Sequence, residues 1–195
     1  ANTVTAMMDA EALNIPVLQI GGAVATNKRD AGDLQDMSTL TLMESCCKWA
    51  RKINATNRIP EYVSMAFRHA QDNSPGPVYL EVPTDLLSTQ VDLERVKFPT
   101  NYMATSIPGG APALIEEAAA LLASADRPAV VVDDGAFWTL GENSEAISEL
   151  SDFLKMPIGV VGTGCRGHFG NERENAMVKL NASSKADVVL ALGCR

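Results

Sequence analysis

The 195-residue sequence lacks the features that would place it in several broad classes of protein. No apolar run approaches the roughly 20 residues of a membrane helix. The N-terminus shows no basic region followed by an apolar core and a cleavage site. We therefore expect no membrane partner and a cytoplasmic location. Lys+Arg 16 against Asp+Glu 24 leaves a net charge of -8, so nucleic acid is not an expected partner, because clustered cations carry phosphate binding.

Cysteine and histidine are also scarce. The four cysteines, Cys46, Cys47, Cys165 and Cys194, have no CxxC spacing, which favours buried reduced thiols over a zinc site or a redox pair. The histidines, His69 and His168, have no nucleophile or acid partner nearby in sequence, so a packing or helix-end role is favoured over a general base. The residues alone assign no catalytic group and no metal ligand.

Residues 74–85 give the clearest structural prediction in the sequence. Pro75, Gly76 and Pro77 exclude a helix, since proline fixes φ and has no N–H donor. Residues 78–82 predict a buried strand, and Pro83 is expected to end its pairing. Ligands gather beyond such strand ends in open α/β sheets, so residues 83–85 are a candidate site edge.

The residues before this stretch predict one more strand and one clear helix. Residues 16–20 are typical of a short buried strand, with Gly21 and Gly22 expected in its exit loop. Residues 26–35 predict a loop, and the secondary structure of 37–49 is ambiguous. Pro60 lies just inside the start of a predicted helix that runs to the break at 72–74.

Helical and extended segments alternate in the second half. Helices are expected at 112–123 and 144–154, and strands at 129–133, 158–161 and 187–192. This order predicts an α/β fold with mainly parallel sheets flanked by helices. Residues 90–110 have the composition of a linker, so we expect two modules, 1–89 and 111–195, of which the second is Rossmann-like.

Two strand exits of the second module are candidate binding loops. Residues 162–170 contain four glycines, whose backbone can approach a phosphate or a flat ring, although the spacing is not GxGxxG and a simple tight connection is the alternative. Asp133 and Asp134 can hold a metal or a ribose hydroxyl, but a solvated turn is favoured there.

The order of several short motifs resembles the pyrimidine-binding domain of thiamine-diphosphate enzymes of the acetolactate synthase type. Those motifs are residues 15–22, Gln35-Asp36-Met37, Lys48-Trp49 and residues 75–85. The module from 111 onward is similar to the central domain of the same family, through the strand at 129–133, the loop at 162–164 and the closing residues 186–195. The resemblance covers essentially the whole sequence.

This resemblance implies an enzyme in which thiamine diphosphate, held with Mg²⁺, adds to a 2-keto acid, and carbon dioxide is lost. The family's activating glutamate and its diphosphate-binding domain lie outside these residues. We therefore expect a piece truncated at both ends and no independent catalysis. The intact enzyme is expected to be a homo-oligomer, a dimer or a tetramer.

The resemblance also implies positions near cofactors. Asn2 matches an asparagine near the cofactor pyrimidine, and Gln35 and Lys48 match positions that line the substrate channel beside a flavin. Gly162, Thr163, Gly164 and Cys165 match a loop that contacts FAD.

Departures from the family pattern keep a second reading open. Ala23 replaces a usual glutamine, residues 133–135 replace a more glycine-rich turn, and residues 172–184 lack the usual flavin contact. A carboligase with FAD and a non-flavin decarboxylase or carbon–carbon lyase are both retained. A third alternative is a stand-alone nucleotide-binding or interaction module without catalysis.

Overall fold

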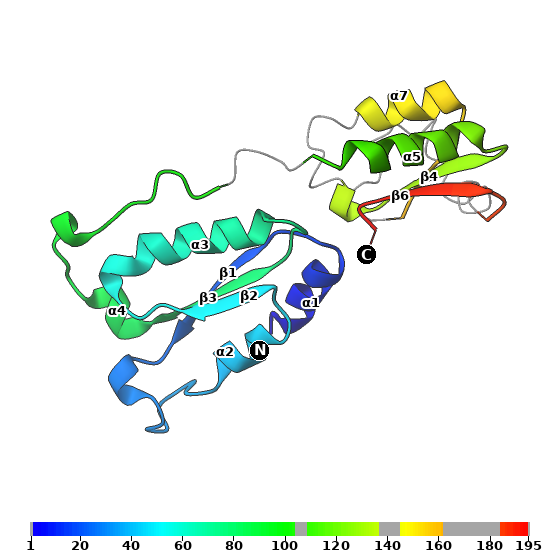
Figure 1. Ribbon diagram of the computed structural model, residues 1–195. Helices are drawn as coiled ribbons and strands as arrows, with labels where there is room; N and C mark the ends of the chain where they lie inside the picture. Colours follow the sequence, from blue (N-terminus) through cyan, green and yellow to red (C-terminus); the bar gives the residue numbers. More distant parts are fainter. Residues whose placement is uncertain (1, 104–108, 137–144, 162–183, 195) are drawn as a thin grey trace. The chain divides into compact units, whose positions relative to one another are not determined.

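A computed structural model of the protein describes residues 2–103, 109–136, 145–161 and 184–194 (Figure 1). The chain divides into two compact units, Ala1–Ser106 and Ile107–Arg195. Each unit contains its own three-stranded parallel sheet. The expected α/β class, with two parallel sheets flanked by helices, is therefore confirmed.

The first unit is built around a sheet with the strand order β1-β3-β2. Its elements are α1 (Val4–Ala12), β1 (Leu18–Ala23), a 3-10 turn (Thr26–Lys28), α2 (Thr39–Glu44), β2 (Trp49–Lys52), a 3-10 turn (Thr56–Arg58), α3 (Ile59–Gln71), β3 (Val78–Pro83), α4 (Thr84–Ser88) and a 3-10 turn (Leu93–Arg95). β3 pairs in parallel with β1 on one side and with β2 on the other. All six residues of β3 are buried, as expected for a central strand.

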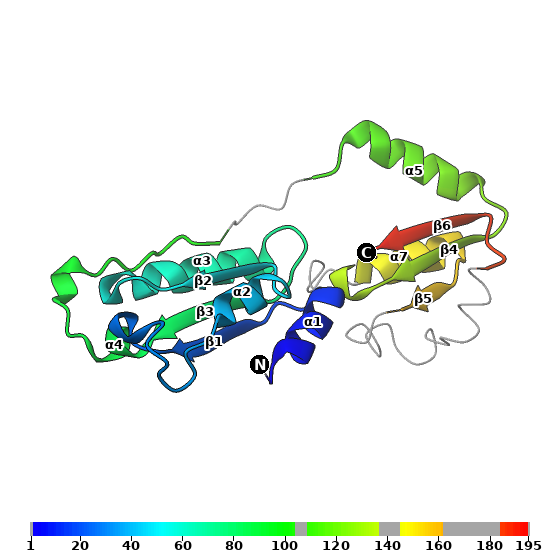
Figure 2. The same cartoon turned by 90° about the horizontal axis from the view of Figure 1, so that it is seen from below.

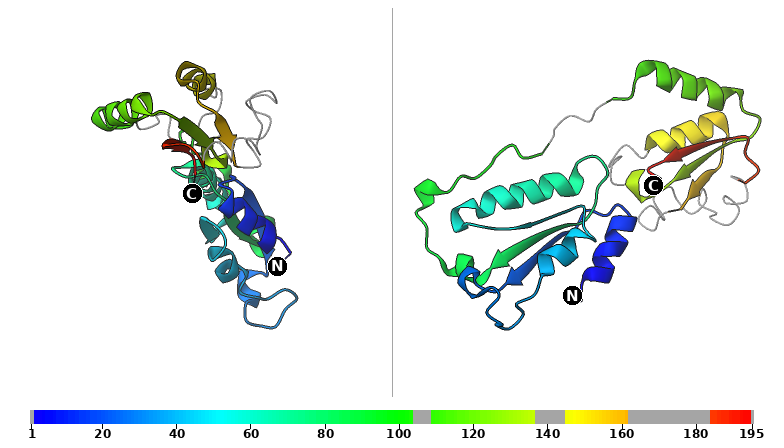
Figure 3. Two further views of the ribbon diagram at one scale, coloured as in Figure 1. Left: turned by 90° about the vertical axis from the view of Figure 1, so that its right-hand side faces the viewer. Right: turned by 60° about the horizontal axis from the view of Figure 1, so that its bottom comes forward.

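Helices cover both faces of this sheet (Figure 3). Val78, Leu80 and Val82 pack with α3 on one face. Tyr79, whose side chain points to the opposite face, packs with Met7 of α1 and Met43 of α2. Alternate residues of one strand therefore anchor two separate clusters.

The prediction that Gly21 and Gly22 form the exit loop of the first strand is wrong, because both lie inside β1. A Cβ atom on Gly21 would stand 2.2 Å from the hydroxyl oxygen of Tyr79 on the neighbouring strand. The tyrosine ring needs the space that a side chain would take. Gly21 therefore allows the Tyr79 ring to pack closely against β1, and it does not form a turn.

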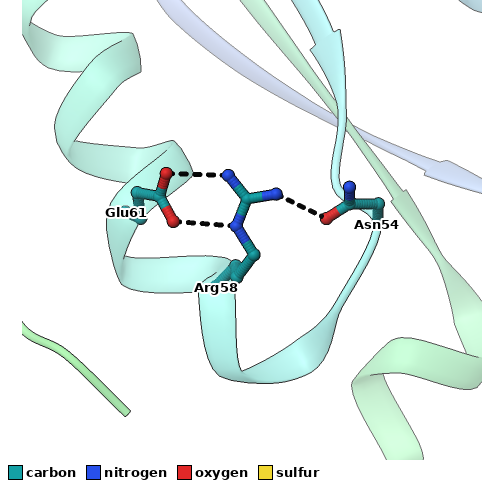
Figure 4. A network of polar contacts seen from close by, with 3 residues as sticks. All are labelled: Asn54, Arg58 and Glu61. Carbon is teal, nitrogen blue, oxygen red and sulfur yellow. Dashed lines mark hydrogen bonds and ion pairs between the residues drawn. The ribbon is translucent and has the colours of Figure 1, made fainter.

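Helix α3 begins where the sequence predicted, with Pro60 in its first turn. Arg58 donates two hydrogen bonds to the carboxylate of Glu61, at 2.8 and 2.7 Å, and a third to Oδ1 of Asn54 at 3.2 Å (Figure 4). This network links Asn54, in the connection after β2, to the start of α3. The connection to β3 then passes through Asn73, which has a φ of 53°.

The second unit has the strand order β5-β4-β6, again all parallel (Figure 2). Its described elements are α5 (Pro112–Ser124), β4 (Pro128–Val132), α7 (Glu145–Leu154), β5 (Ile158–Val160) and β6 (Val188–Leu192). Val130 and Val132 of the central strand pack with Ile147 of α7 and Ile158 of β5. Across the residues that the structure describes, no helix is both long and apolar enough to traverse a membrane.

Candidate functional site

The exits of β1 and β3 meet at the carboxyl edge of the first sheet. The backbone N–H of Thr26 donates to Oδ1 of Asp85 at 3.0 Å, and the Thr26 hydroxyl donates to Oδ2. The hydrogen bond from the hydroxyl makes the largest contribution to holding the pKa of Asp85 below its usual value, and the backbone hydrogen bond adds to it. Asp85 is therefore a tie between two strand exits, and its carboxylate already has donors on both oxygens.

Two residues before the end of β3, the buried carboxylate of Glu81 lies close to the ammonium of Lys52. Lys52 of β2 and Gly21 of β1 flank Glu81 of β3 in the strand register. The Lys52 ammonium lies 3.8 Å from Oε1 of Glu81, whose side chain is 2% exposed against 23% for Lys52. Oε1 has no hydrogen-bond partner, so the contact is an ion pair without a hydrogen bond.

Tyr79 belongs to the same face of the sheet as Glu81. Burial raises the pKa of the Tyr79 phenol to about 12, with smaller contributions from the charges of Glu81 and Cys47. The phenol is therefore neutral across the physiological range. It is placed above Gly21 as a packing group and not as a base.

Asn2, which was predicted to lie near a cofactor pyrimidine, is exposed just before α1. The neighbouring Thr3 hydroxyl accepts a hydrogen bond of 2.7 Å from Nε2 of Gln19 in β1. This bond attaches the start of the chain to the first sheet. It fixes the segment that carries Asn2, and the role of Asn2 itself stays a prediction.

Gln35 and Lys48, which were predicted to line one channel, lie in different loops. Gln35 is exposed in the connection between β1 and α2, with a φ of 64°. Lys48 directly precedes β2, so it lies at the amino edge of the sheet, away from the Thr26–Asp85 tie. The shared channel stays a prediction.

The ammonium of Lys48 supports the connection before β3. It donates to the carbonyl of Ser74 at 2.8 Å and to the carbonyl of Asp72. The backbone N–H of Lys48 also donates to the carbonyl of Pro77 at 2.9 Å. Burial lowers the pKa of Lys48, against the opposite effect of the Asp72 and Glu11 charges. Lys48 thus holds the loop 72–77 in place.

In the second unit, the expected flavin-contact residues Gly162, Thr163, Gly164 and Cys165 lie outside the described residues. The neighbouring exits of β4 and β6 are described. The prediction of a solvated turn after β4 is wrong for Asp134, which is completely buried. The next residue, Gly135, contacts the end of β6.

That contact is between two glycines. A Cβ atom on Gly135 would stand 2.6 Å from the carbonyl oxygen of Gly193, and one on Gly193, whose φ is 66°, would stand 1.9 Å from the backbone N of Ala136. The strand order changes direction between β4 and β6, where parallel sheets often bind ligands. Here the chain's own backbone fills the space that the glycines leave, so they provide no cradle for a flavin.

The described residues contain no group of three or more His, Cys, Asp or Glu side chains that could hold a metal ion. They therefore do not fit a Mg²⁺ site.

Comparison with known proteins identifies homologues of the chain. No family model matches the sequence. The chain is 29% identical over its full length to a probable acetolactate synthase large subunit of Methanocaldococcus jannaschii, covering 34% of that protein. It is 26% identical over 98% of its length to 2-hydroxyacyl-CoA lyase 2 of Homo sapiens, covering 35% of that protein. The chain is a homologue of these enzymes.

The resemblance to acetolactate synthase-like, thiamine-diphosphate-dependent enzymes is thereby confirmed. Over about half of the chain, the identity to 2-hydroxyacyl-CoA lyase 2 of Danio rerio reaches 37%. The chain spans about a third of the length of the first relatives it matches.

Sequence reasoning missed the pairs Thr26–Asp85, Lys52–Glu81 and Gly21–Tyr79. In each pair the partners come from different strands or strand exits, so their spacing in the sequence carries no periodic signal. A correct strand register would have indicated Lys52–Glu81, which are directly opposite, whereas it places Gly21 opposite Glu81 and only diagonal to Tyr79.

Proposed function

We propose that this chain forms part of a thiamine-diphosphate-dependent enzyme that makes or breaks a carbon–carbon bond beside the carbonyl of a 2-keto acid or a related substrate. The observation that supports this proposal is the homology of the whole chain to acetolactate synthase large subunits and to a 2-hydroxyacyl-CoA lyase. Acetolactate and a 2-hydroxyacyl-CoA both carry a hydroxyl group on the carbon next to a carbonyl. We further propose that the intact enzyme is a homo-oligomer, a dimer or a tetramer.

Thiamine diphosphate would supply the carbanion that adds to the substrate carbonyl. The described residues contain no cluster of three or more metal-ligating side chains, and the Gly135–Gly193 contact is closed by backbone, so we assign no reaction step to them. What this part of the protein does is hold its strand exits in fixed positions, through Thr26–Asp85 in the first unit and Gly135–Gly193 in the second. We expect no turnover from the chain alone.

The alternative within the same chemistry is a lyase or decarboxylase without flavin. The match to 2-hydroxyacyl-CoA lyase 2 over 98% of the chain supports it, as does Ala23 in place of the glutamine usual in synthases. An alternative of another class is a stand-alone nucleotide-binding module. The parallel sheet of the second unit suits it, since such sheets commonly bind nucleotides.

Activity of the longest polypeptide that the gene encodes separates these readings. With thiamine diphosphate and Mg²⁺, a synthase converts pyruvate to acetolactate, whereas a lyase cleaves a 2-hydroxyacyl-CoA. A flavin absorbance band in the active protein supports the FAD-containing synthase, and a colourless active preparation eliminates it. Absence of both activities, together with nucleotide binding by the 195-residue chain alone, contradicts the enzyme proposal.

The predicted channel residues can be tested in the same protein. If Gln35 lines the substrate channel, Gln35→Ala raises KM while the free energy of unfolding stays unchanged, because the side chain is exposed. Lys48→Met is expected to loosen the loop 72–77, since two carbonyl oxygens lose their donor. An unchanged KM in Gln35→Ala removes Gln35 from the site.

A further inference from the structure

Sulfur-containing side chains gather on the face of the first sheet that carries Tyr79. The buried cluster there includes Met7 of α1, Met43 of α2 and Cys46, and Cys47 packs against it. Two thioethers and two thiols therefore belong to one cluster. Packing alone accepts such residues, because methionine and cysteine are both common in protein cores. A ligand role requires in addition that the sulfur atoms lie at the distances that ligands of one ion have.

Three of these sulfur atoms come from one short segment at the end of α2. Met43 lies in the last turn of the helix, and three positions later the backbone N–H of Cys46 donates to its carbonyl at 3.2 Å. This turn brings Sγ of Cys46 to 4.0 Å from Sδ of Met43. A side-chain hydrogen bond joins the thiols of Cys46 and Cys47. Met43 and Cys46 are buried and Cys47 is half-buried, so Cys47 is the member that solvent reaches.

The separation of these sulfur atoms suits three ligands of a single ion. Metal–sulfur bonds in proteins are about 2.3 Å long, so three sulfurs at the corners of a triangle around one ion are about 4.0 Å apart. The distance between Cys46 and Met43 has this value. A disulfide suits the cysteine pair less well. Neighbouring Cα atoms are about 3.8 Å apart, below the roughly 4.4 Å at which the usual range for disulfides begins.

We propose that Met43, Cys46 and Cys47 bind one Cu(I) ion, a soft monovalent cation. Thiolate and thioether ligands select Cu(I). Structural zinc sites take four ligands, and in the described part of the chain the two cysteines belong to no group of three or more His, Cys, Asp or Glu side chains that could hold a metal. Cu(I) displaces the protons of both thiols, which pass to solvent.

The surroundings of Cys47 favour a cation over a free thiolate. Burial makes the largest contribution to raising the pKa of the Cys47 thiol to about 12, and the charges of Cys46 and Glu11 and the hydrogen bond to Cys46 add to it. The empty pair is therefore protonated at neutral pH and is a poor nucleophile. A bound metal ion keeps its coordinating thiols deprotonated, and its positive charge reduces the same repulsion.

The measurement is a Cu(I) titration of the 195-residue chain without oxygen, in competition with the coloured Cu(I) chelator bathocuproine disulfonate. The variant Cys165→Ser/Cys194→Ser removes the two thiols outside the cluster and should still bind one Cu(I) per chain. Adding Cys47→Ser should abolish this binding. Because Cys47 is half-buried, this change preserves the fold better than a change of Cys46. Zn²⁺ should not displace the bound Cu(I).

Two methionines of the same cluster provide a matched comparison. Met43→Leu and Met7→Leu are the same nearly volume-conserving change at two buried positions. Met43→Leu should weaken Cu(I) binding at least about tenfold, the smallest loss that even residues supporting a metal ligand produce. Met7→Leu should leave the affinity unchanged. Urea midpoints of both variants show whether the two changes affect packing equally.

Four results overturn the proposal. The first is failure of the Cys165→Ser/Cys194→Ser variant to bind Cu(I), and the second is binding that survives Cys47→Ser. The third is equal affinity of Met43→Leu and Met7→Leu, which would leave the cluster a packing feature. The fourth is saturation at one Cu(I) per two chains, because the ion would then join two copies through Cys47.

Discussion

Gly21 shows how one residue without a side chain fixes the packing of a sheet face. The Tyr79 hydroxyl occupies the position that a Cβ on Gly21 would need. Gly22, the next residue in the same strand, has open space around it. Two adjacent glycines in one strand therefore have different tolerance for substitution, and the difference can be measured.

We predict that Gly21→Ala lowers the free energy of unfolding by about 1–3 kcal/mol, the usual cost of overpacking a tight interior. The tyrosine ring must move or the strands must separate to admit the methyl group. Gly22→Ala is the control and should change stability little. Urea denaturation of the 195-residue chain measures both, and equal stability of the two variants would contradict the packing role of Gly21.

The Lys52–Glu81 pair leads to a second prediction at this scale. Lys52→Met leaves the Glu81 carboxylate buried without its cation, which should cost about 2–3 kcal/mol of stability. The double variant Lys52→Met/Glu81→Gln should recover part of that loss, because no buried charge remains. Urea denaturation of the wild type, both single variants and the double variant gives the coupling. Additive effects would show that the two side chains do not interact.

At the scale of elements, an aromatic stack joins β2 to α3. The rings of Trp49 and His69 lie 5.1 Å apart at an angle of 18°, and the guanidinium carbon of Arg51 is 5.7 Å from the Trp49 ring centroid. Burial lowers the pKa of His69, and the charges of Arg68, Lys48 and Arg51 lower it further against the effect of Asp72. The stack is therefore formed by a neutral imidazole at pH 7.

This lowered pKa predicts a loss of stability in mild acid. The unfolded chain binds the His69 proton near pH 6.5, before the folded chain does. The contribution of the neutral imidazole is thus fully present above pH 6.5 and is lost as the pH falls through the lower pKa of the folded state. His69→Phe retains a ring and cannot be protonated.

Urea midpoints of the wild type and His69→Phe between pH 8 and pH 5 measure this effect. The wild type should lose stability relative to the variant below about pH 6.5. Other titrating groups are common to both proteins and cancel in the difference. A difference that does not change with pH would contradict the prediction.

The central strands could be predicted from the sequence, and the edge strands less well. β4 is a continuous apolar run and β3 is one apart from Glu81, a pattern typical of strands buried on both faces. β2, Trp-Ala-Arg-Lys, lies at an edge, so its charged residues gave no strand pattern. In β1 the glycine pair indicated a turn, since the Tyr79 ring that requires Gly21 lies 58 positions further along the chain.

In the candidate site too, features set by local sequence could be predicted, and contacts between distant residues could not. Local pattern alone placed Thr84 and Asp85 beyond the end of a strand, whereas Pro83, expected outside the pairing, is the last residue of β3. The partner of Asp85, Thr26, lies 59 residues away and had no local signal. Positions that came from family resemblance, such as Asn2 and Gln35, could be located on the fold but not assigned a contact.

At the scale of the whole chain, each unit has its own sheet and its own buried clusters. We therefore predict that residues 1–103 and 109–195, expressed separately, each fold, and that each unfolds at the midpoint it has in the intact chain. Circular dichroism in urea measures this. A shift of either midpoint after separation would show that the units stabilise one another.

The strand order of the first unit also constrains its synthesis on the ribosome. β1 and β2 do not pair with each other, and both require β3, which is the last of the three in the chain. Neither of the two pairings described for this sheet can form until residues 78–83 have been translated and have left the exit tunnel. The apolar side chains of β1, Ile20 among them, must therefore wait for translation of more than fifty further residues, a period in which a nascent chain is most open to chaperone binding.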